Sequence, residues 1–140
     1  MRDLRVPAKA DPGLSLREMK EFVQNHFEDF VNRKKSEVAL ANFSSDFLDH
    51  DEPTGVEVGP EAARNMMEAA YKRWPDLSVK VEDILAEGDK VMVRNSWTAT
   101  EAETGQRIEF HGFVLWRFAK KKIVERWATI TPPAPVRTKV

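Results

Sequence analysis

Apolar residues near the start of the chain recur every third or fourth position. This spacing runs through residues 16–31 and predicts an amphipathic helix of about four turns. Ser15 and Glu18 form a capping-box pattern at its start, so the helix is expected to begin there. A shorter helix is predicted within residues 35–43, and the acidic residues 44–54 predict an extended stretch and a loop.

The next helical stripe begins after Gly59-Pro60. Proline suits the first position of a helix because the N–H that it lacks would have no partner inside the helix. The stripe continues to Trp74, and Pro75 ends it because the residue before a proline disfavours helical geometry. Residues 60–74 are therefore predicted to form the second long helix.

After Pro75, apolar and polar residues alternate, as they do in strands with one buried face. Four strands are predicted, over residues 77–86, 91–101, 107–119 and 123–130. The short turns between them imply an antiparallel meander. Helices followed by strands are typical of an α+β fold, in which a twisted sheet covered by helices leaves a concave space for a small ligand.

The bulk composition limits the classes of function. One domain is predicted over residues 15–131 of the 140, with a flexible arm at 1–14 and an irregular tail at 132–140. The net charge of −1, without a basic stripe, argues against nucleic acid as a partner. No segment resembles a membrane span or a secretory signal, so a cytoplasmic protein without a membrane partner is expected. The lack of cysteine excludes disulfides, thiolate zinc sites and cysteine nucleophiles.

Three segments of the sequence form a recognisable series. They are FLDHDEP with the helix GPEAARNMMEAAYKRWPD, the strand pair VEDILAEGDKVMVRNSWTATE, and the closing FHGFVLWRFAKKKIVERWATI. In order and spacing they resemble the nuclear-transport-factor-2-like superfamily, and within it the SnoaL-like polyketide cyclases, over residues 15–131. The resemblance implies a cone-like fold, with N-terminal helices packed over a curved, mainly antiparallel sheet of four to six strands that encloses a pocket.

The sequence departs from the family at the position of its catalytic acid. In cyclases of this family, an Asp just after the last-strand Trp acts as general acid and base for an intramolecular aldol closure. Here Trp127 is followed by Ala128, whose methyl group cannot move a proton. The cyclase reaction by that route is therefore not expected.

Two histidines are candidates for proton transfer. The resemblance places His50 at the rim of the pocket, where Asp51 is the best placed carboxylate to pair with it. His111 lies in a long strand, in a neighbourhood where the family has a polar group or a histidine. The alternatives are a loop histidine bonded to local backbone and a strand histidine with no role in chemistry.

Arg126 is the third candidate for a catalytic role. It shares a strand face with Ala128, and the resemblance turns that face toward the pocket. A guanidinium there could hold a carboxylate or polarise a carbonyl, and the alternative is a structural salt bridge at a sheet edge or interface. The same argument extends to Arg94 on its own strand.

Further residues are predicted to line the pocket, although aromatic side chains at such spacing are more often simply core. The predicted pocket residues are Asp51, Met67, Tyr71, Trp74, Arg94, Trp97, Phe113 and Ala128. His26, beside the apolar stripe of the first helix, is interpreted as a helix-boundary histidine. The acids around His50 include metal-ligand types, but neighbouring acids point in different directions, so neither a metal nor any other cofactor is predicted.

Three readings of function remain open on the sequence alone. The first is a cofactor-independent cyclase-, isomerase- or hydrolase-like enzyme that acts on a small hydrophobic molecule, with both histidines facing one pocket. The second is a non-catalytic ligand-binding domain with a dry apolar cavity. The third is a dimerisation module, and under any reading the resemblance implies a homodimer that pairs through the outer face of the sheet.

Overall fold

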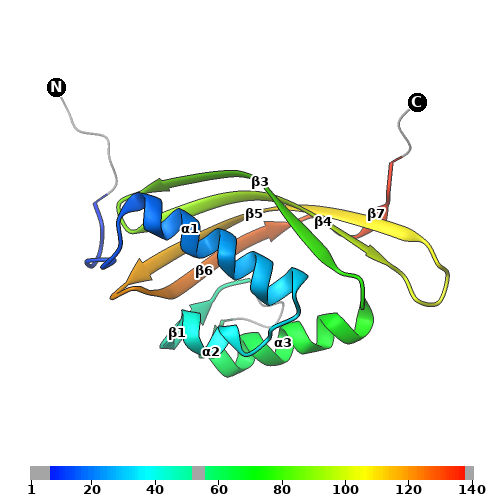
Figure 1. Cartoon of the computed structure of the whole chain (residues 1–140), viewed down its shortest axis with the longest axis horizontal. Coiled ribbons are helices and arrows are strands. Elements are labelled where there is room, and N and C mark those ends of the chain that lie inside the picture. The colour runs from blue at the N-terminus through cyan, green and yellow to red at the C-terminus, as the bar shows by residue number, and fades with distance from the viewer. Residues whose placement is uncertain (1–6, 52–55, 138–140) are drawn as a thin grey trace.

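In the computed structural model, which describes residues 7–51 and 56–137, the helices cover one face of a curved sheet (Figure 1). The sheet has seven strands, and six of them follow the order β2-β1-β6-β5-β4-β3, while β7 pairs with β5. Residues 1–6 of the predicted arm, 52–54 of the predicted loop and 138–140 of the predicted tail lie outside the described residues. The α+β fold class predicted from the order of the elements is confirmed.

The first helix, α1 (Leu16–Phe27), begins where the capping box predicts. The Glu18 backbone N–H donates to Ser15 Oγ at 3.1 Å, and the Ser15 N–H donates to Glu18 Oε1 at 2.9 Å. The helix continues into one π-helical turn, η1 (Glu28–Asn32). The Asn32 side chain bonds both backbone groups of Val79, which fixes this widened turn against the edge of the sheet.

The middle of the chain lies in the lower part of Figure 1. It contains α2 (Val38–Asn42), β1 (Phe43–Asp49), β2 (Glu57–Val58) and α3 (Pro60–Arg73). The predicted extended stretch is thus a true strand. It runs parallel to the last long strand of the sheet, with Asp49 opposite Arg126, and this is a pairing that local sequence does not reveal.

The predicted meander is present as four antiparallel strands. They are β3 (Ser78–Glu87), β4 (Lys90–Thr100), β5 (Arg107–Ala119) and β6 (Lys122–Ile130). An irregularity in the β5–β6 register gives Ile123, not Val124, the position opposite Phe118. Uninterrupted alternation along this strand would put Val124 on the same face as Arg126, but the bulge shifts the alternation by one residue, so Val124 does not share that face.

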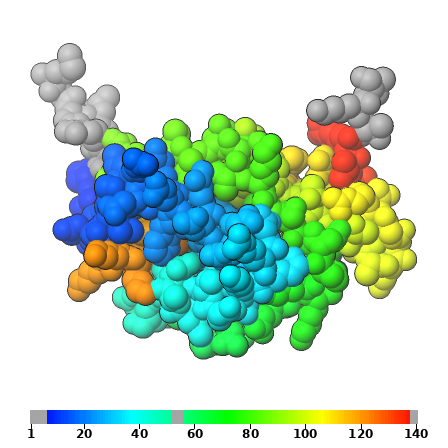
Figure 2. Space-filling view, in the orientation of Figure 1, coloured from blue at the N-terminus to red at the C-terminus, as the bar shows by residue number. Residues whose placement is uncertain are grey.

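The core lies between the inner face of the meander and the helices. Val91, Val93 and Val114 on the sheet are fully buried, as are Met19 and Val23 on α1. Figure 2 shows α1, α2 and α3 together covering this side of the molecule. Within the described residues, none of the helices is long and apolar enough to cross a membrane.

The described parts of the arm and tail make backbone contacts with the domain. Lys120 N–H donates to the Asp11 carbonyl at 3.1 Å, and Lys121 N–H donates to the Pro12 carbonyl at 2.7 Å. In the tail, β7 (Ala134–Pro135) pairs with the start of β5. Both segments thus lie against the sheet rather than over the helices.

Candidate functional site

A cavity lies between the inner face of the sheet and α1, η1, β1 and α3. Its volume is about 40 Å³, and because a water needs about 10–15 Å³ by this measure, roughly three waters fit. The apolar lining residues are Phe27, Phe30, Val31, Phe43, Ala63, Met66, Met67, Trp97 and Trp116. The polar lining residues are His26, Asp49 and Arg126. A small polar group thus lies within an aromatic interior.

Arg126 and Asp49 form a buried ion pair at one end of the cavity. They face each other on neighbouring strands, and their side chains are 13% and 5% exposed. Arg126 Nη1 lies 3.0 Å from Asp49 Oδ1 and 3.3 Å from Asp51 Oδ2. The guanidinium also lies 5.5 Å from the centre of the Trp116 ring. These contacts hold the charged head of Arg126 in one place.

His26 reaches the cavity from the last turn of α1. Its ring stacks on Phe30 at 4.9 Å between centroids and meets the edge of Trp116 at 5.5 Å. Burial and, to a smaller extent, the nearby positive charge of Arg126 together lower the pKa of His26 to about 3. The imidazole is therefore neutral under ordinary conditions, which makes it a poor base but a usable hydrogen-bond donor.

The structure brings together only some of the side chains predicted from the sequence. Arg126, Met67 and Trp97 line the cavity. Ala128 lies on the same sheet face opposite Val114, so the position where the family has its acid carries only a methyl group. Asp51 is not part of the cavity lining, but it is the second carboxylate in contact with Arg126.

His50 does not face the cavity. Its Nε2 lies 2.6 Å from Glu125 Oε2, and its ring stacks on Trp127 at 5.0 Å on the outer face of the sheet. Glu125 also accepts a hydrogen bond from Arg117 Nε at 2.8 Å. The pKa of Glu125 is lowered: burial acts to raise it, but the bonds from Arg117 and His50 together outweigh burial. This outer network stabilises the end of β1 against β6.

His111 also lies on the outer face and is 53% exposed. Its Nδ1 lies 3.4 Å from Ser96 Oγ, and its Nε2 lies 3.9 Å from Glu109. His50 lies at Glu125, whose register partner on β5 is Arg117, and His111 is six residues from Arg117 along the same strand. The two predicted histidines therefore do not meet. The expectation that both face one pocket is wrong, because strand alternation turns each of them outward.

Four other predicted pocket residues also lie outside the cavity lining. Arg94 pairs with Asp83 at 2.6 Å on the outer face, where Phe113 is 55% exposed. Tyr71 donates from its hydroxyl to the Phe30 carbonyl, and burial raises its pKa to about 12. Trp74 packs against Phe110, with its ring 5.7 Å away. These residues support the walls or the outer surface instead.

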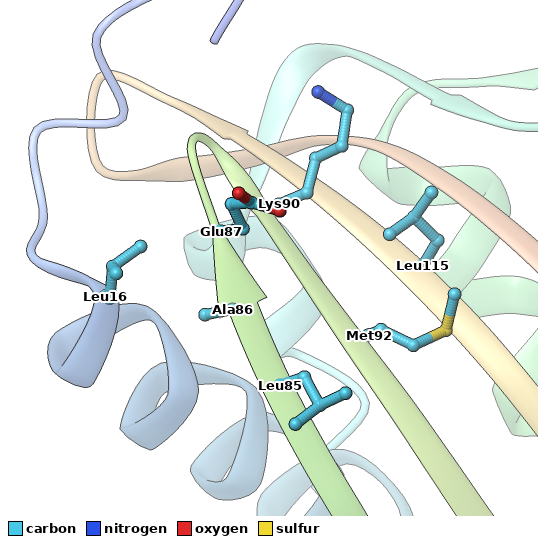
Figure 3. A pocket seen from close by; sticks show the side chains of 7 residues that line it. All are labelled: Leu16, Leu85, Ala86, Glu87, Lys90, Met92 and Leu115. Atoms are coloured by element: carbon cyan, nitrogen blue, oxygen red, sulfur yellow. The ribbon is translucent and has the colours of Figure 1, made fainter. Parts of the chain in front are cut away.

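The outer face carries an apolar row that runs across four strands. Leu85, Met92, Leu115 and Trp127 are direct register partners from β3 to β6. Figure 3 shows three of these side chains side by side in a shallow depression, with Leu16 at its rim. We call this row, together with Phe113, the outer apolar row. Leu85 is 69% exposed and Met92 is 37% exposed.

Two site residues escaped the sequence reasoning, although each had a signal. His26 falls inside the apolar stripe of α1, three residues after Val23 and four before Phe30, which places it on the buried face. Asp49 lies two residues after the buried Phe47 on the same strand face. Within residues 7–51 and 56–137, no three His, Cys, Asp or Glu side chains are grouped as a metal site would require.

Comparisons with solved structures agree with this architecture. The proposed hydroxylase AclR from Streptomyces galilaeus is 30% identical, with a TM-score of 0.74 over 84% of this chain and 91% of that chain. A proposed polyketide cyclase from Bacillus cereus is 28% identical, with a TM-score of 0.71 over 93% of this chain and 89% of that chain. IdmH from Streptomyces antibioticus, a proposed polyketide cyclase, is 22% identical over 79% of this chain and 89% of that chain, with a TM-score of 0.72, and shows the fold alone.

The sequence itself matches a family model. None of the curated proteins matches this chain. The model of the SnoaL-like polyketide cyclase family, however, matches residues 21–131, which include every strand of the meander and every residue of the cavity. The chain therefore belongs to the SnoaL-like polyketide cyclase family.

Proposed function

We propose that this protein binds a compact, mainly apolar molecule in its interior cavity. The observation that supports this most directly is the convergence of His26, Asp49 and Arg126 in an otherwise aromatic lining. Burying polar groups costs free energy of folding, so packing alone does not explain why they lie at a cavity wall. Such a cluster counts against the reading of a dry, purely apolar cavity. Two of the relatives, named as a hydroxylase and a polyketide cyclase, agree with a role in small-molecule chemistry.

The wall formed by α3 offers a route for ligand entry. Met66 is 40% exposed and Met67 is partly buried, and both line the cavity. Methionine side chains are flexible and change rotamer at little cost. A ligand larger than roughly three waters would therefore enter by displacing these two side chains rather than the sheet.

Filling the cavity is expected to abolish binding. Ala63 is buried at the wall, and Ala63→Leu would place three further carbons in a space of about 40 Å³. We expect the affinity for a small cyclic ketone such as cyclopentanone to fall by at least roughly tenfold, because the ligand would lose its contact volume. A titration followed by ¹H–¹⁵N NMR would measure this change. Ala62→Leu, one residue away and outside the lining, is the matched control and should bind as the unaltered chain does.

An acid–base enzyme is the second candidate function, and Asp49 is the observation that favours it. Asp49 is the carboxylate that lines the cavity. Its register partner Arg126 is two residues from Ala128 on the same face of β6. Its carboxylate would accept a proton from the carbon beside a carbonyl, leave an enolate, and then return the proton.

This candidate predicts that the protein speeds the exchange of ketone α-protons in D₂O. Cyclopentanone would exchange faster with the protein than in buffer, and Asp49→Asn would remove most of the acceleration, roughly tenfold or more. Proton NMR measures the exchange directly. Asp46→Asn, which changes an exposed acid on the same strand, should keep it. Exchange at the buffer rate with the unaltered chain would refute the enzyme and leave the binding proposal in place.

The outer apolar row supports the proposal that the protein is a homodimer. Exposed apolar side chains in one continuous row are unusual on a monomer and typical of interfaces. Met92 lies at the centre of the row. The substitution Met92→Lys is expected to weaken the dimer by roughly tenfold or more, because a lysine charge would be buried between the sheets.

Sedimentation velocity at micromolar concentration would measure the dimer. Leu40→Lys places the same charge on an exposed apolar position of α2 and should leave the oligomeric state unchanged. A monomeric unaltered chain would contradict the dimer. A cytoplasmic location remains a prediction from the sequence.

A further inference from the structure

A second hollow of the molecule lies where strand β1 separates from β6. The two strands pair at Phe43 with Ile123 and again at Leu48 with Glu125, so β1 advances five residues while β6 advances two. The extra residues of β1 bulge away from β6. Figure 1 shows the turn between β5 and β6 at this same end of the sheet. An open cleft of about 600 Å³, which we call the turn cleft, lies between the bulge and that turn. Binding sites for small molecules usually measure about 300–1,000 Å³.

The turn cleft has an excess of positive charge. Arg117, Lys120 and Lys122 line it, and Asp46 is the one carboxylate among its described lining residues. Arg117 also pairs through Nε with Glu125, which lies outside the lining. Even with Glu125 counted, the cations exceed the carboxylates by one, whereas the whole chain carries a net charge of −1. The rest of the Arg117 guanidinium keeps N–H groups that can bind an anion.

The turn at one end of the cleft has a strained backbone. Ala119 pairs with Lys122, which leaves a two-residue turn whose members, Lys120 and Lys121, have φ values of 50° and 66°. Such turns favour Asn and Gly, because a side chain with a long stem is strained in the left-handed region. The N-terminal arm holds the turn in place, since the Lys120 N–H donates to the Asp11 carbonyl at 3.1 Å. Lysines kept at strained positions indicate a role for at least one of the side chains.

The other groups of the cleft define the ligand more closely. The Ser44 hydroxyl donates to Asp46 Oδ1 at 2.7 Å, which satisfies part of the one opposing carboxylate. Ammonium and guanidinium groups are the side-chain donors that bind phosphate, and a phosphate dianion is attracted more strongly than a carboxylate with one charge. The lining also has an apolar part, with Leu40, which is 41% exposed, and Val124. A ligand that fills the cleft therefore combines a phosphate with a small apolar group.

We propose that the turn cleft is a second binding site, which takes a phosphate monoester of a small apolar alcohol. The phosphate would contact Arg117, Lys120 and Lys122, and the apolar group would lie on Leu40. Lys122 Nζ already donates to a carbonyl of α2, which holds its ammonium group at the wall opposite the turn. Phe43, which lines both hollows and is 4% exposed, forms the wall between this cleft and the interior cavity.

Phenyl phosphate, inorganic phosphate and benzoate test the ligand class on the unaltered chain. At about pH 8 the phosphate carries close to two charges. We expect phenyl phosphate to bind roughly tenfold or more tightly than either of the others, because inorganic phosphate lacks the ring and benzoate lacks the second charge. In a titration followed by ¹H–¹⁵N NMR, the shifted amides should lie in residues 44–46 and 117–124. No binding, equal affinity for benzoate or inorganic phosphate, or shifts at the interior cavity instead would overturn the proposal.

Two single variants separate the cleft from the positive charge of the turn as a whole. Lys120→Asn removes a charge from the lining, and asparagine tolerates a positive φ better than lysine. We expect the affinity for phenyl phosphate to fall roughly tenfold while the unfolding temperature rises, as when a functional residue is exchanged for a more stable one. Lys121→Asn is the matched control: it makes the same change outside the lining and should raise the unfolding temperature without loss of affinity.

Unchanged affinity in Lys120→Asn, or an equal loss in both variants, would overturn the assignment to the cleft. A lower unfolding temperature in Lys120→Asn would contradict the strain argument on which the site rests. Ala63→Leu, which fills the interior cavity, should leave the binding of phenyl phosphate unchanged. The proposal for the turn cleft and the proposal for the interior cavity can therefore fail independently.

Discussion

Acidification from pH 7 to pH 4 is expected to lower the free energy of unfolding by about 3 kcal/mol through His26 alone. The folded pKa of His26 is about 3, against an ordinary value of 6.5 that applies to the unfolded chain. Between these values the unfolded state binds a proton that the folded state does not bind. Stability is therefore intact above pH 6.5, falls as the pH drops below it, and stops falling through this group below about pH 3.

Urea unfolding of the unaltered chain and of His26→Phe, at pH 7 and pH 4, measures this contribution. Carboxyl groups with lowered pKa values, such as Glu125 and Asp76, also cost stability in acid, but they do so in both proteins. The difference in pH dependence between the two proteins therefore isolates His26. His111→Phe changes an exposed histidine and should keep the full dependence. Equal pH dependence in His26→Phe and the unaltered chain would contradict a buried neutral histidine.

The substitution Arg126→Met is expected to destabilise the fold by about 3–5 kcal/mol at neutral pH. It would leave the carboxylate of Asp49, which is 5% exposed, buried without its counter-charge. The cost comes mainly from that unpaired charge rather than from the lost attraction. It should therefore exceed the effect of removing any exposed ion pair of this protein.

Two further variants separate this explanation from a simple loss of packing. Asp49→Leu combined with Arg126→Met removes both charges and should recover much of the lost stability, because a well-packed apolar pair often replaces a buried ion pair at little cost. Arg94→Met breaks the 2.6 Å contact between Arg94 and Asp83, whose side chains are 47% and 64% exposed, respectively. We expect about 1 kcal/mol or less for it. A double variant no more stable than Arg126→Met would contradict the account.

Local patterns accounted for most of the secondary structure. The capping box at Ser15, the proline at position 60 and the alternation after Pro75 each act over a few residues, so they are readable in the sequence. The inward position of Arg126 also followed from strand alternation, once the face of Ala128 was inferred from the family. The bulge beside Val124 was not readable, because it depends on how β6 aligns with β5.

The make-up of the site depended on a contact distant in sequence. Strand β1 pairs with β6 in a register that puts Asp49 opposite Arg126. Since the side-chain period of a strand is two, that register turns Asp49 into the cavity and His50 outward to Glu125. A slip of one residue would exchange their roles. Alternation within the segment puts Asp49 on the face of Phe47, but only the pairing with β6 decides that this is the inner face.

The sequence by itself determined the α+β order, the family and the absence of the family's acid at Ala128. Each of these is a property of residue identity and short-range spacing. Only the tertiary structure decided that His26, Asp49 and Arg126 meet while His50 and His111 do not. The physical reason is that the direction in which a side chain points depends on how its helix or strand packs against the others. His26 points into the cavity because the apolar stripe of α1 packs on the sheet, and Asp49 points there because of the β1–β6 pairing.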